Sequence, residues 1–414
     1  MASGRHRSIG MNHSASQIGG LSLEQARAQL RPWTQRAPAI GEGEYQQRIE
    51  RARALLRAKG RDALLIGAGT SLRYFTGITW GASERLVAML LTLDGDPLLI
   101  CPGFEAGSLA HELKIPVQPR YWEEHEDPYA LVVDGLRARG ASRLALDPAA
   151  AFAIFTGLRA ASPTLDLSDA SVIVDGCRAA KTPAELALMK QATAMTLQAH
   201  RLAAGLAEPG VTTTQLRRFI DEAHRAFGAD NGSTFCIVQF GQATAYPHGI
   251  PGEQILREGE LVLIDTGCAV QGYQSDITRT YICGRADAQQ QRVWDLELAA
   301  QQAAFAAVRP GVSGEAVDRA AREVLERGGL GPDYRLPGLP HRTGHGCGMS
   351  VHEAPYLVRG NTRGLEIGNC CSNEPMIVVP DRFGVRLEDH FYVTENGAAW
   401  FTPPSLAIDR PFAD

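Results

Sequence analysis

The sequence has few features that would set it apart from ordinary globular proteins. Its 414 residues include only eight cysteines, none in a Cys-x-x-Cys pair, so neither a disulfide framework nor a zinc knuckle is indicated. Neither sign of charge dominates, because 41 Lys and Arg stand against 46 Asp and Glu. The longest nearly unbroken apolar run, residues 86–93, is far shorter than the ~20 residues of a membrane helix. We therefore expect no nucleic-acid partner and no membrane partner.

The N-terminus lacks the apolar segment of a signal peptide. Residues 1–10 precede a second methionine, Met11, so they are interpreted as a leader or an upstream start. Residues 1–44 are polar and predict an N-terminal arm. Scattered cysteines without an export signal predict a cytoplasmic protein.

The length predicts two domains. From residue 45 to 177, apolar runs typical of strands alternate with amphipathic helical patterns, which predicts a three-layer α/β domain. The predicted strands are 63–66, 86–93, 97–101 and 144–146, and the predicted helices are 45–59, 127–140 and 149–161.

A second domain is predicted over residues 178–414. Thr182, Pro183 and Glu185 form a helix-start pattern, with the threonine as N-cap. The helix that they begin is expected to reach residue 207. The pattern that follows mixes helices and strands, which predicts an α+β domain. Further helices are expected at 212–227, 288–308 and 313–328, and strands at 235–240, 261–266 and 276–283.

Two aspartates in this second domain suggest a site. Asp265 ends an apolar run, and Asp276 lies 11 residues later at the start of a returning strand. A hairpin turning near Gln271 and Gly272 would bring both carboxylates together at its base. Two such charges stay ionised at close range only if a cation holds them. Surface aspartates that cap turns are the alternative for an isolated pair.

Histidines cluster in the segment 341–353, where His341, His345 and His352 are interleaved with glycines. Neutral imidazoles bind metals or carry protons, and glycines let a backbone approach a ligand closely. A flexible loop that happens to contain histidines is the alternative.

Two glutamates in strand-like contexts complete the set, Glu374 before a proline and Glu388 after Arg386-Leu. Four carboxylates and one imidazole balance the charge of two divalent cations. An oxygen-rich set without thiolates favours Mn²⁺, with Co²⁺, Zn²⁺ or Fe²⁺ as alternatives. Two neighbouring metals activate water and polarise a carbonyl, so the residues predict a dinuclear hydrolase. The set is Asp265, Asp276, His345, Glu374 and Glu388.

This order of residues, in the contexts Asp265-Thr-Gly, Ser-Asp276, Gly344-His345-Gly, Asn373-Glu374-Pro and Arg386-Leu-Glu388-Asp, resembles the pita-bread metallopeptidase family. Methionine aminopeptidases, Xaa-Pro aminopeptidases, prolidases and creatinase belong to that family. The segment 178–185 also resembles the start of its catalytic domain. The resemblance spans residues 45–405, and it implies a creatinase-N-like α/β N-terminal domain followed by an α+β pita-bread catalytic domain.

The resemblance also implies roles for the ligands. Asp276 and Glu388 would each bridge two metal ions, Asp265 would bind one ion, and His345 with Glu374 would bind the other. A metal-bound hydroxide would attack the scissile carbonyl, and Glu374 would also handle the proton.

Further residues are implied in catalysis and substrate binding. His352 would stabilise the tetrahedral intermediate. His248 matches a histidine that borders the substrate pocket and is counted in both groups. His341 matches another histidine, near the proline of the substrate. Arg386 is expected in the substrate site, tethering a ligand carboxylate. Tyr356 is the last member of this group.

The choice of substrate depends on Tyr356. A dipeptidase must bind the free carboxylate of the terminal proline, and some prolidases carry an arginine four residues after the histidine that matches His352. Here that position is Tyr356, so Arg342, Arg359 or an arginine of the N-terminal domain would have to substitute. The chain length and the short N-terminal domain still resemble bacterial prolidases. We expect an Xaa-Pro dipeptidase that acts on proline-containing dipeptides or short peptides and forms a homodimer.

Two other functions remain open. An Xaa-Pro aminopeptidase would remove the first residue from longer peptides with proline second. A pseudoenzyme would keep the fold as a peptide-binding module, although the full ligand set argues against this reading. A lyase on a similar scaffold has an aspartate two residues after the first ligand, where this chain has Gly267.

Overall fold

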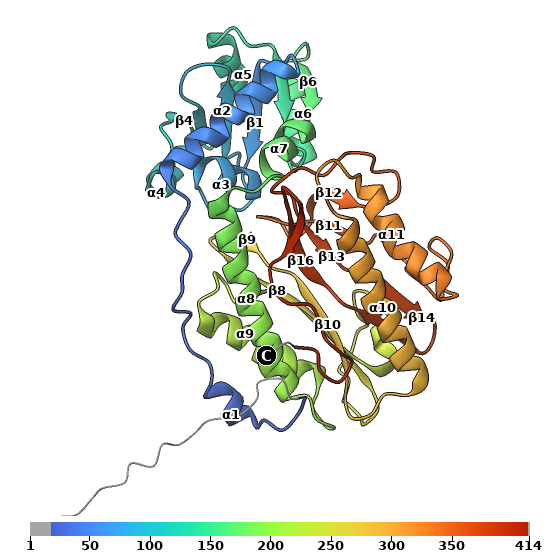
Figure 1. Cartoon of the computed structure of the whole chain (residues 1–414). Helices are drawn as coiled ribbons and strands as arrows, with labels where there is room; N and C mark the ends of the chain where they lie inside the picture. The colour runs from blue at the N-terminus through green and yellow to red at the C-terminus, as the bar shows by residue number, and fades with distance from the viewer. Residues whose placement is uncertain (1–17, 413–414) are drawn as a thin grey trace, which may run out of the picture. The chain divides into compact units, whose positions relative to one another are not determined.

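The computed structural model describes residues 18–412. The expected leader, residues 1–10, therefore lies outside the described residues. The chain divides into two compact units, each with its own core (Figure 1). Unit 1 comprises the described parts of Met1–Arg36, Leu188–Gly346 and Pro355–Asp414, and unit 2 comprises Ala37–Ala187 and Cys347–Ala354.

Unit 2 is built on a six-stranded mixed sheet with the order β4-β3-β2-β1-β5-β6. Strand β1 pairs antiparallel with β2 and parallel with β5. The strands are β1 (Ala63–Gly67), β2 (Ala88–Thr92), β3 (Leu98–Pro102), β4 (Gln118–Trp122), β5 (Arg143–Leu146) and β6 (Asp166–Asp169). The helices are α2 (Glu42–Ala58), α3 (Thr70–Thr76), α4 (Ala106–Glu112), α5 (Pro128–Ala138), α6 (Phe152–Ala161) and α7 (Ser171–Arg178), with the short 3₁₀ helix η1 (Gly103–Glu105).

The sheet of unit 2 is buried between helices. Alternate residues of its central strands, such as Leu65 and Leu90, pack with Val132 and Leu136 of α5 in one apolar cluster. Helices α2 and α7 pack against each other as a separate pair. Because side chains alternate across a strand, both faces of β1 to β3 need apolar cover. The predicted three-layer α/β arrangement is confirmed.

Unit 1 is an α+β structure. Its long helix α8 (Pro183–Gly205), whose first five residues belong to unit 2, begins at Pro183 as predicted, with Thr182 and Glu185 forming the capping interactions. The other helices are α1 (Leu23–Arg27), α9 (Thr213–Phe227), α10 (Ala288–Ala307), α11 (Gly314–Arg327) and η2 (Gly241–Ala245). The strands are β7 (Ser233–Phe240), β8 (Leu261–Val270), β9 (Tyr273–Gln274), β10 (Ile277–Ile282), β11 (Gly344–Gly346), β12 (Glu353–Leu357), β13 (Cys370–Asn373), β14 (Met376–Val379), β15 (Phe383–Arg386), β16 (Asp389–Thr394) and β17 (Gly397–Trp400).

The strands of unit 1 form two main sheets, β10-β8-β7 and β12-β11-β13-β16-β17, and the pair β14-β15. In Figure 1 they lie between α8 and α9 on one side and α10 and α11 on the other. A β-bridge between Thr278 and Glu388 joins the beginning of β10 to the residue before β16. The core beneath α10 and α11 contains Trp294, Phe391 and the apolar residues of β14 and β15.

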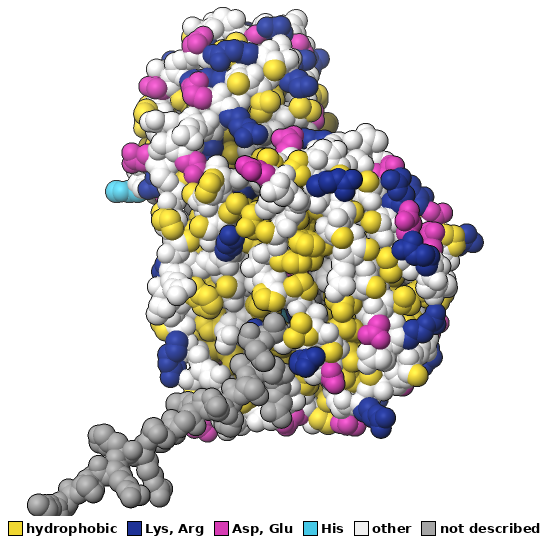
Figure 2. Space-filling model, viewed as in Figure 1, with side chains coloured by type: hydrophobic (Ala, Val, Ile, Leu, Met, Phe, Trp, Pro, Cys, Tyr) yellow, Lys and Arg dark blue, Asp and Glu magenta, His cyan; other side chains and the backbone are white. Residues whose placement is uncertain are grey.

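The face that Figure 2 shows carries charges of both signs. On the face that Figure 2 shows, acidic and basic side chains are interspersed with apolar ones. None of the helices in the described part of the chain has the length and apolarity that a membrane crossing requires.

Candidate metal centre

The first two predicted ligands lie on one hairpin. Strand β8 turns at Gln271 and Gly272, both with positive φ, and returns through β9 and β10. Asp265 of β8 faces Thr278 across the ladder, and Asp276 immediately precedes β10. The predicted hairpin is confirmed, and it brings the two aspartates together at its base.

His345 and Glu374 come from neighbouring strands of the five-stranded sheet. The Nε2 atom of His345 lies 3.0 Å from Oε1 of Glu374 and 3.8 Å from Oδ2 of Asp276. The Nδ1–H group of His345 donates to the carbonyl of Gly346 at 3.0 Å, which directs Nε2 toward the carboxylates. Ser372 accepts from the backbone N–H of His345 and donates to Glu374, so it holds both residues in place.

Glu388 enters the group through the bridge to β10. The Thr278 hydroxyl donates to its Oε2 atom at 2.7 Å, and the Glu388 backbone N–H donates to the Thr278 carbonyl at 3.0 Å. Two residues earlier, Arg386 donates from Nη2 to Oδ2 of Asp265 at 2.5 Å and from Nη1 to the Pro247 carbonyl at 3.2 Å. The buried Arg386 guanidinium is thus bound to a carboxylate.

One oxygen of each of three carboxylates has no hydrogen-bond donor in the described part of the chain. These atoms are Oδ1 of Asp265, Oδ1 of Asp276 and Oε1 of Glu388, and all are buried. A buried carboxylate oxygen without a donor costs free energy unless a cation satisfies it. The orphaned oxygens and the Nε2 atom of His345 are therefore a donor set that fits divalent metal ions.

The pKa shifts reflect the close approach of these carboxylates to one another. Burial, together with the charges of Glu388 and Asp265, raises the pKa of Asp276 well above its ordinary value. Burial and the charge of Glu374 raise the pKa of Glu388 well above its ordinary value too. Burial acts in the same direction on Glu374, but the combined attraction of His345, His341 and Arg386 outweighs it and lowers the pKa of that carboxyl. Four carboxylates at close range, three of them buried, need positive charge to stay ionised.

Within unit 1, potential ligand atoms converge in two groups whose members lie within 4.8 Å of one another. One group is His345, Glu374 and Glu388, and the other is Asp276, Glu388 and His390. Glu388 belongs to both groups, as a residue between two ions would.

His390 is the residue that sequence reasoning missed. It is fully buried, and it stands two positions after Glu388, so the two side chains share one face of the strand. This spacing of two was visible in the sequence, and it was the signal that could have identified the histidine.

A fully buried polar network supports the ligands from behind. Arg279 forms an ion pair with Asp389 at 2.6 Å. Gln301 of α10 donates to Asp389 and to the carbonyls of Asn373 and Leu387. Asn373, Leu387 and Asp389 are the direct neighbours of the ligands Glu374 and Glu388. The network therefore holds the two ligand-bearing segments in register.

The predicted substrate residues occupy different positions. His248 is exposed, and the carbonyl of the preceding Pro247 accepts from Arg386. His341 is half-buried, its Nδ1–H donates to the Arg342 carbonyl at 2.7 Å, and its buried Nε2 has no hydrogen-bond partner. Burial lowers the pKa of His341, which keeps the ring neutral.

Tyr356 and His352 belong to different units. Tyr356 is half-buried in unit 1, where the Arg342 guanidinium lies 4.5 Å from the centre of its ring. His352 is exposed on the segment Cys347–Ala354, which clusters with unit 2. The neighbouring Glu353 is tied within unit 2 to Lys181 and Arg178, at 2.6 and 2.5 Å.

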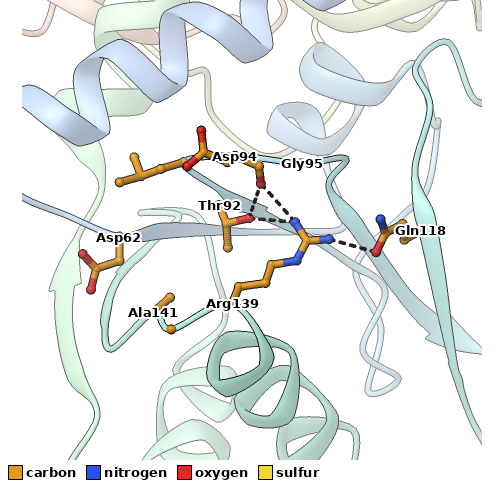
Figure 3. Close-up of a pocket in the computed structure, with 9 residues that line it drawn as sticks. Asp62, Thr92, Asp94, Gly95, Gln118, Arg139 and Ala141 are labelled. Carbon is orange, nitrogen blue, oxygen red and sulfur yellow. Dashed lines mark hydrogen bonds between the residues drawn. The ribbon is translucent and has the colours of Figure 1, made fainter.

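A separate pocket of about 500 Å³ belongs to unit 2 alone (Figure 3). Arg139 spans it and donates to Thr92 at 2.8 Å and to Gln118 at 3.0 Å. The guanidinium also donates to the carbonyls of Asp94 and Asp96, so its hydrogen-bonding capacity is used within the fold. None of the predicted site residues lines this pocket.

Comparison with known proteins agrees with this geometry. Residues 187–395 match metallopeptidase family M24, and residues 48–180 match the creatinase/prolidase N-terminal domain. An Xaa-Pro dipeptidase from Lactobacillus helveticus is 32% identical over 360 residues, which cover 86% of this chain and 96% of that protein.

Solved structures show the same likeness over nearly the whole chain. Dipeptidase PepE from Mycobacterium ulcerans matches with a TM-score of 0.82 and 34% identity, covering 88% of this chain and 97% of that one. Prolidase from Thermococcus sibiricus matches with a TM-score of 0.80 and 27% identity, covering 88% and 98%.

The chain belongs to metallopeptidase family M24. Its fold is a creatinase-type N-terminal domain followed by a pita-bread catalytic domain, which confirms the expected fold class. The protein is a metal-dependent hydrolase of the prolidase-like kind.

Proposed function

We propose that this protein hydrolyses the Xaa-Pro bond of dipeptides with two divalent metal ions, with Mn²⁺ as the expected metal. The observation that carries the proposal is the group of carboxylates around His345, in which three buried oxygens lack a donor among the described residues. The likeness to an Xaa-Pro dipeptidase over most of the chain supports the choice of substrate.

The proposed ligands are divided between two ions. Asp276 and Glu388 would contact both, Asp265 would complete one site, and His345 with Glu374 would complete the other. When bound, the two cations would lower the pKa of a water molecule between them and polarise the substrate carbonyl.

The side chains would move the protons and position the peptide. Glu374 would accept a proton from the attacking water and pass it to the proline nitrogen as the C–N bond breaks. His352 would donate a hydrogen bond to the developing oxyanion. His248 and His341 would border the bound dipeptide, and the hold of Arg386 on Asp265 would keep that carboxylate oriented.

Hydrolysis of Ala-Pro, compared with the tripeptide Ala-Pro-Ala, tests this proposal. We expect the Mn²⁺-loaded protein to cleave the dipeptide, and chelation to abolish cleavage, because the carboxylates alone supply no electrophile. Separation of the products by chromatography measures both reactions.

Preference for the tripeptide would make the enzyme an Xaa-Pro aminopeptidase instead. Tight binding of peptide without cleavage, at less than about one equivalent of metal, would favour the pseudoenzyme. A homodimer, a cytoplasmic location and a domain boundary at residues 177 and 178 remain predictions beside the catalytic one.

A further inference from the structure

Arg342 and Tyr356 form a stacked pair beside the metal centre. The guanidinium carbon of Arg342 lies 4.5 Å from the centroid of the Tyr356 ring, within the range of a cation–π contact. Both side chains are half-buried, and both belong to unit 1. A backbone hydrogen bond joins the two residues that follow the pair, because the Thr343 N–H donates to the Leu357 carbonyl at 3.1 Å. A ring face that fixes a guanidinium leaves the edge of the planar group available for a ligand.

The pair is close to the proposed metal ligands along two neighbouring strands. The Thr343 carbonyl, directly after Arg342, accepts from the backbone N–H of Glu374 at 2.8 Å. His345 lies three residues after Arg342 on the same segment. On the other side of Arg342, His341 carries the buried Nε2 atom that has no hydrogen-bond partner. A cation and a neutral imidazole thus stand next to the ligands of one metal ion.

The neighbouring arginines are already engaged. Arg359 forms an ion pair with Asp333 and lies over Tyr334. Arg322 forms an ion pair with Asp318 at 2.8 Å and donates to the carbonyls of Leu339 and His341. In contrast, no described carboxylate forms an ion pair with Arg342, and its guanidinium donates no hydrogen bond within the described chain.

We propose that Arg342, held by Tyr356, binds the free α-carboxylate of the C-terminal residue of a dipeptide. This inference rests on the proposed function and assigns the residue that selects dipeptides. A planar guanidinium matches a carboxylate through two parallel hydrogen bonds, whereas a continuing peptide offers it only a neutral carbonyl. Tyr356 therefore takes part in carboxylate binding as the support of the arginine, at the position where some prolidases have an arginine.

The test compares Ala-Pro with Ala-Pro amide, which differs only in the terminal charge. We expect Arg342→Ala to raise KM for Ala-Pro about 10- to 100-fold, the range of a lost hydrogen bond to a charged group. KM for the amide should change less than about 3-fold, and the metal content of the variant should be unchanged. Tyr356→Ala should raise KM for Ala-Pro by part of that amount. Tyr356→Phe should raise it less, because phenylalanine keeps the ring face that contacts Arg342.

Arg359→Ala is the matched control, since it removes an arginine that already has a carboxylate partner; it should leave both substrates unaffected. Equal losses for acid and amide in Arg342→Ala, or a wild-type enzyme that does not prefer the acid, would overturn the inference.

A binding measurement separates this inference from the proposed function. The ligand is Ala-Pro with its peptide carbonyl reduced to a methylene group, together with the corresponding amide, titrated calorimetrically into Mn²⁺-loaded protein. If the protein cleaves no peptide but prefers the acid in an Arg342-dependent manner, the clamp stands and the peptidase proposal fails. If Ala-Pro is cleaved while binding of the acid does not depend on Arg342, the peptidase proposal stands and the role of Arg342 is refuted.

Discussion

At the scale of single residues, the carboxylates of the proposed metal centre destabilise the folded state when no metal is bound. Asp276 and Glu388 are buried near other carboxylates, and each has one oxygen without a donor. Their raised pKa values mean that ionisation is unfavourable in the metal-free fold. Removing one of these charges should therefore stabilise the metal-free protein while it weakens metal binding.

Glu388→Gln tests both expectations, the higher stability without metal and the weaker metal binding. The variant should lose bound Mn²⁺ and activity together, because the side chain belongs to both ligand groups. After chelation it should unfold at a higher temperature than the wild type at pH 7, since one buried like charge is gone. Elemental analysis gives the metal content, and calorimetry gives the midpoint. Unchanged metal content in an active variant would refute the dinuclear reading.

The adjacent carboxylate provides the opposite control. Asp389 is also fully buried, but it forms an ion pair with Arg279. Asp389→Asn leaves that guanidinium without its charge partner, which costs on the order of 3–5 kcal/mol for a buried pair. The two neighbouring substitutions should therefore shift the midpoint of the chelated protein in opposite directions. A lower midpoint for both would mean that packing, not charge, dominates the site.

At the scale of elements, the hairpin of β8 to β10 is the part of the fold on which the site depends most. It carries two ligands, and its strands approach closely after Asp265. A Cβ atom at Gly267 would lie 1.9 Å from the Ser275 carbonyl oxygen, so no side chain fits there without movement of the backbone. Ser275 directly precedes Asp276, and any such movement would displace a ligand.

Gly267→Ala should accordingly destabilise the protein by about 1–3 kcal/mol, the usual cost of overpacking, and weaken Mn²⁺ binding as well. Denaturant unfolding and metal titration measure the two effects. Gly43→Ala on α2 is the control, because open space surrounds that position and alanine favours a helix. Equal behaviour of the two variants would show that the close approach at Gly267 does not matter.

At the scale of the whole molecule, global unfolding should depend on pH through a carboxyl outside the ligand set. Glu297 of α10 is fully buried, and neither of its carboxyl oxygens has a hydrogen-bond partner in the described chain. Burial raises its pKa well above the ordinary value, against a weaker effect of the Arg386 charge. Between the ordinary and the raised pKa, the folded state holds a proton that the unfolded state has lost. Stability therefore falls as the pH rises through that window.

Glu297→Gln should flatten this dependence, because glutamine resembles the protonated acid and does not titrate. Relative to the wild type, the variant should gain stability as the pH rises from 5 to 8, by about 1.4 kcal/mol for each unit of the raised pKa that is crossed. Denaturant unfolding of the Mn²⁺-loaded proteins at several pH values measures the difference. Parallel curves for the two proteins would contradict the prediction.

Most of the fold could be predicted from the sequence because the central elements are strongly patterned. The strands β1, β2 and β3 are buried along their whole length, so they stand out as apolar runs. Sequence reasoning missed β4 and β6, which are the two edges of that sheet. Edge strands bury few side chains, and polar residues such as Arg120 and Asp166 hide their pattern.

The sequence by itself determined which residues could bind metal: four carboxylates and one imidazole, in contexts that predict a dinuclear metal site. The tertiary structure decided which groups meet. Only pairing between distant strands brings His390 toward Asp276 and sets Arg342 against Tyr356. The physical reason is that residue types and periodicity are local properties of a chain. Contact between side chains depends instead on the register of strands that lie far apart in sequence.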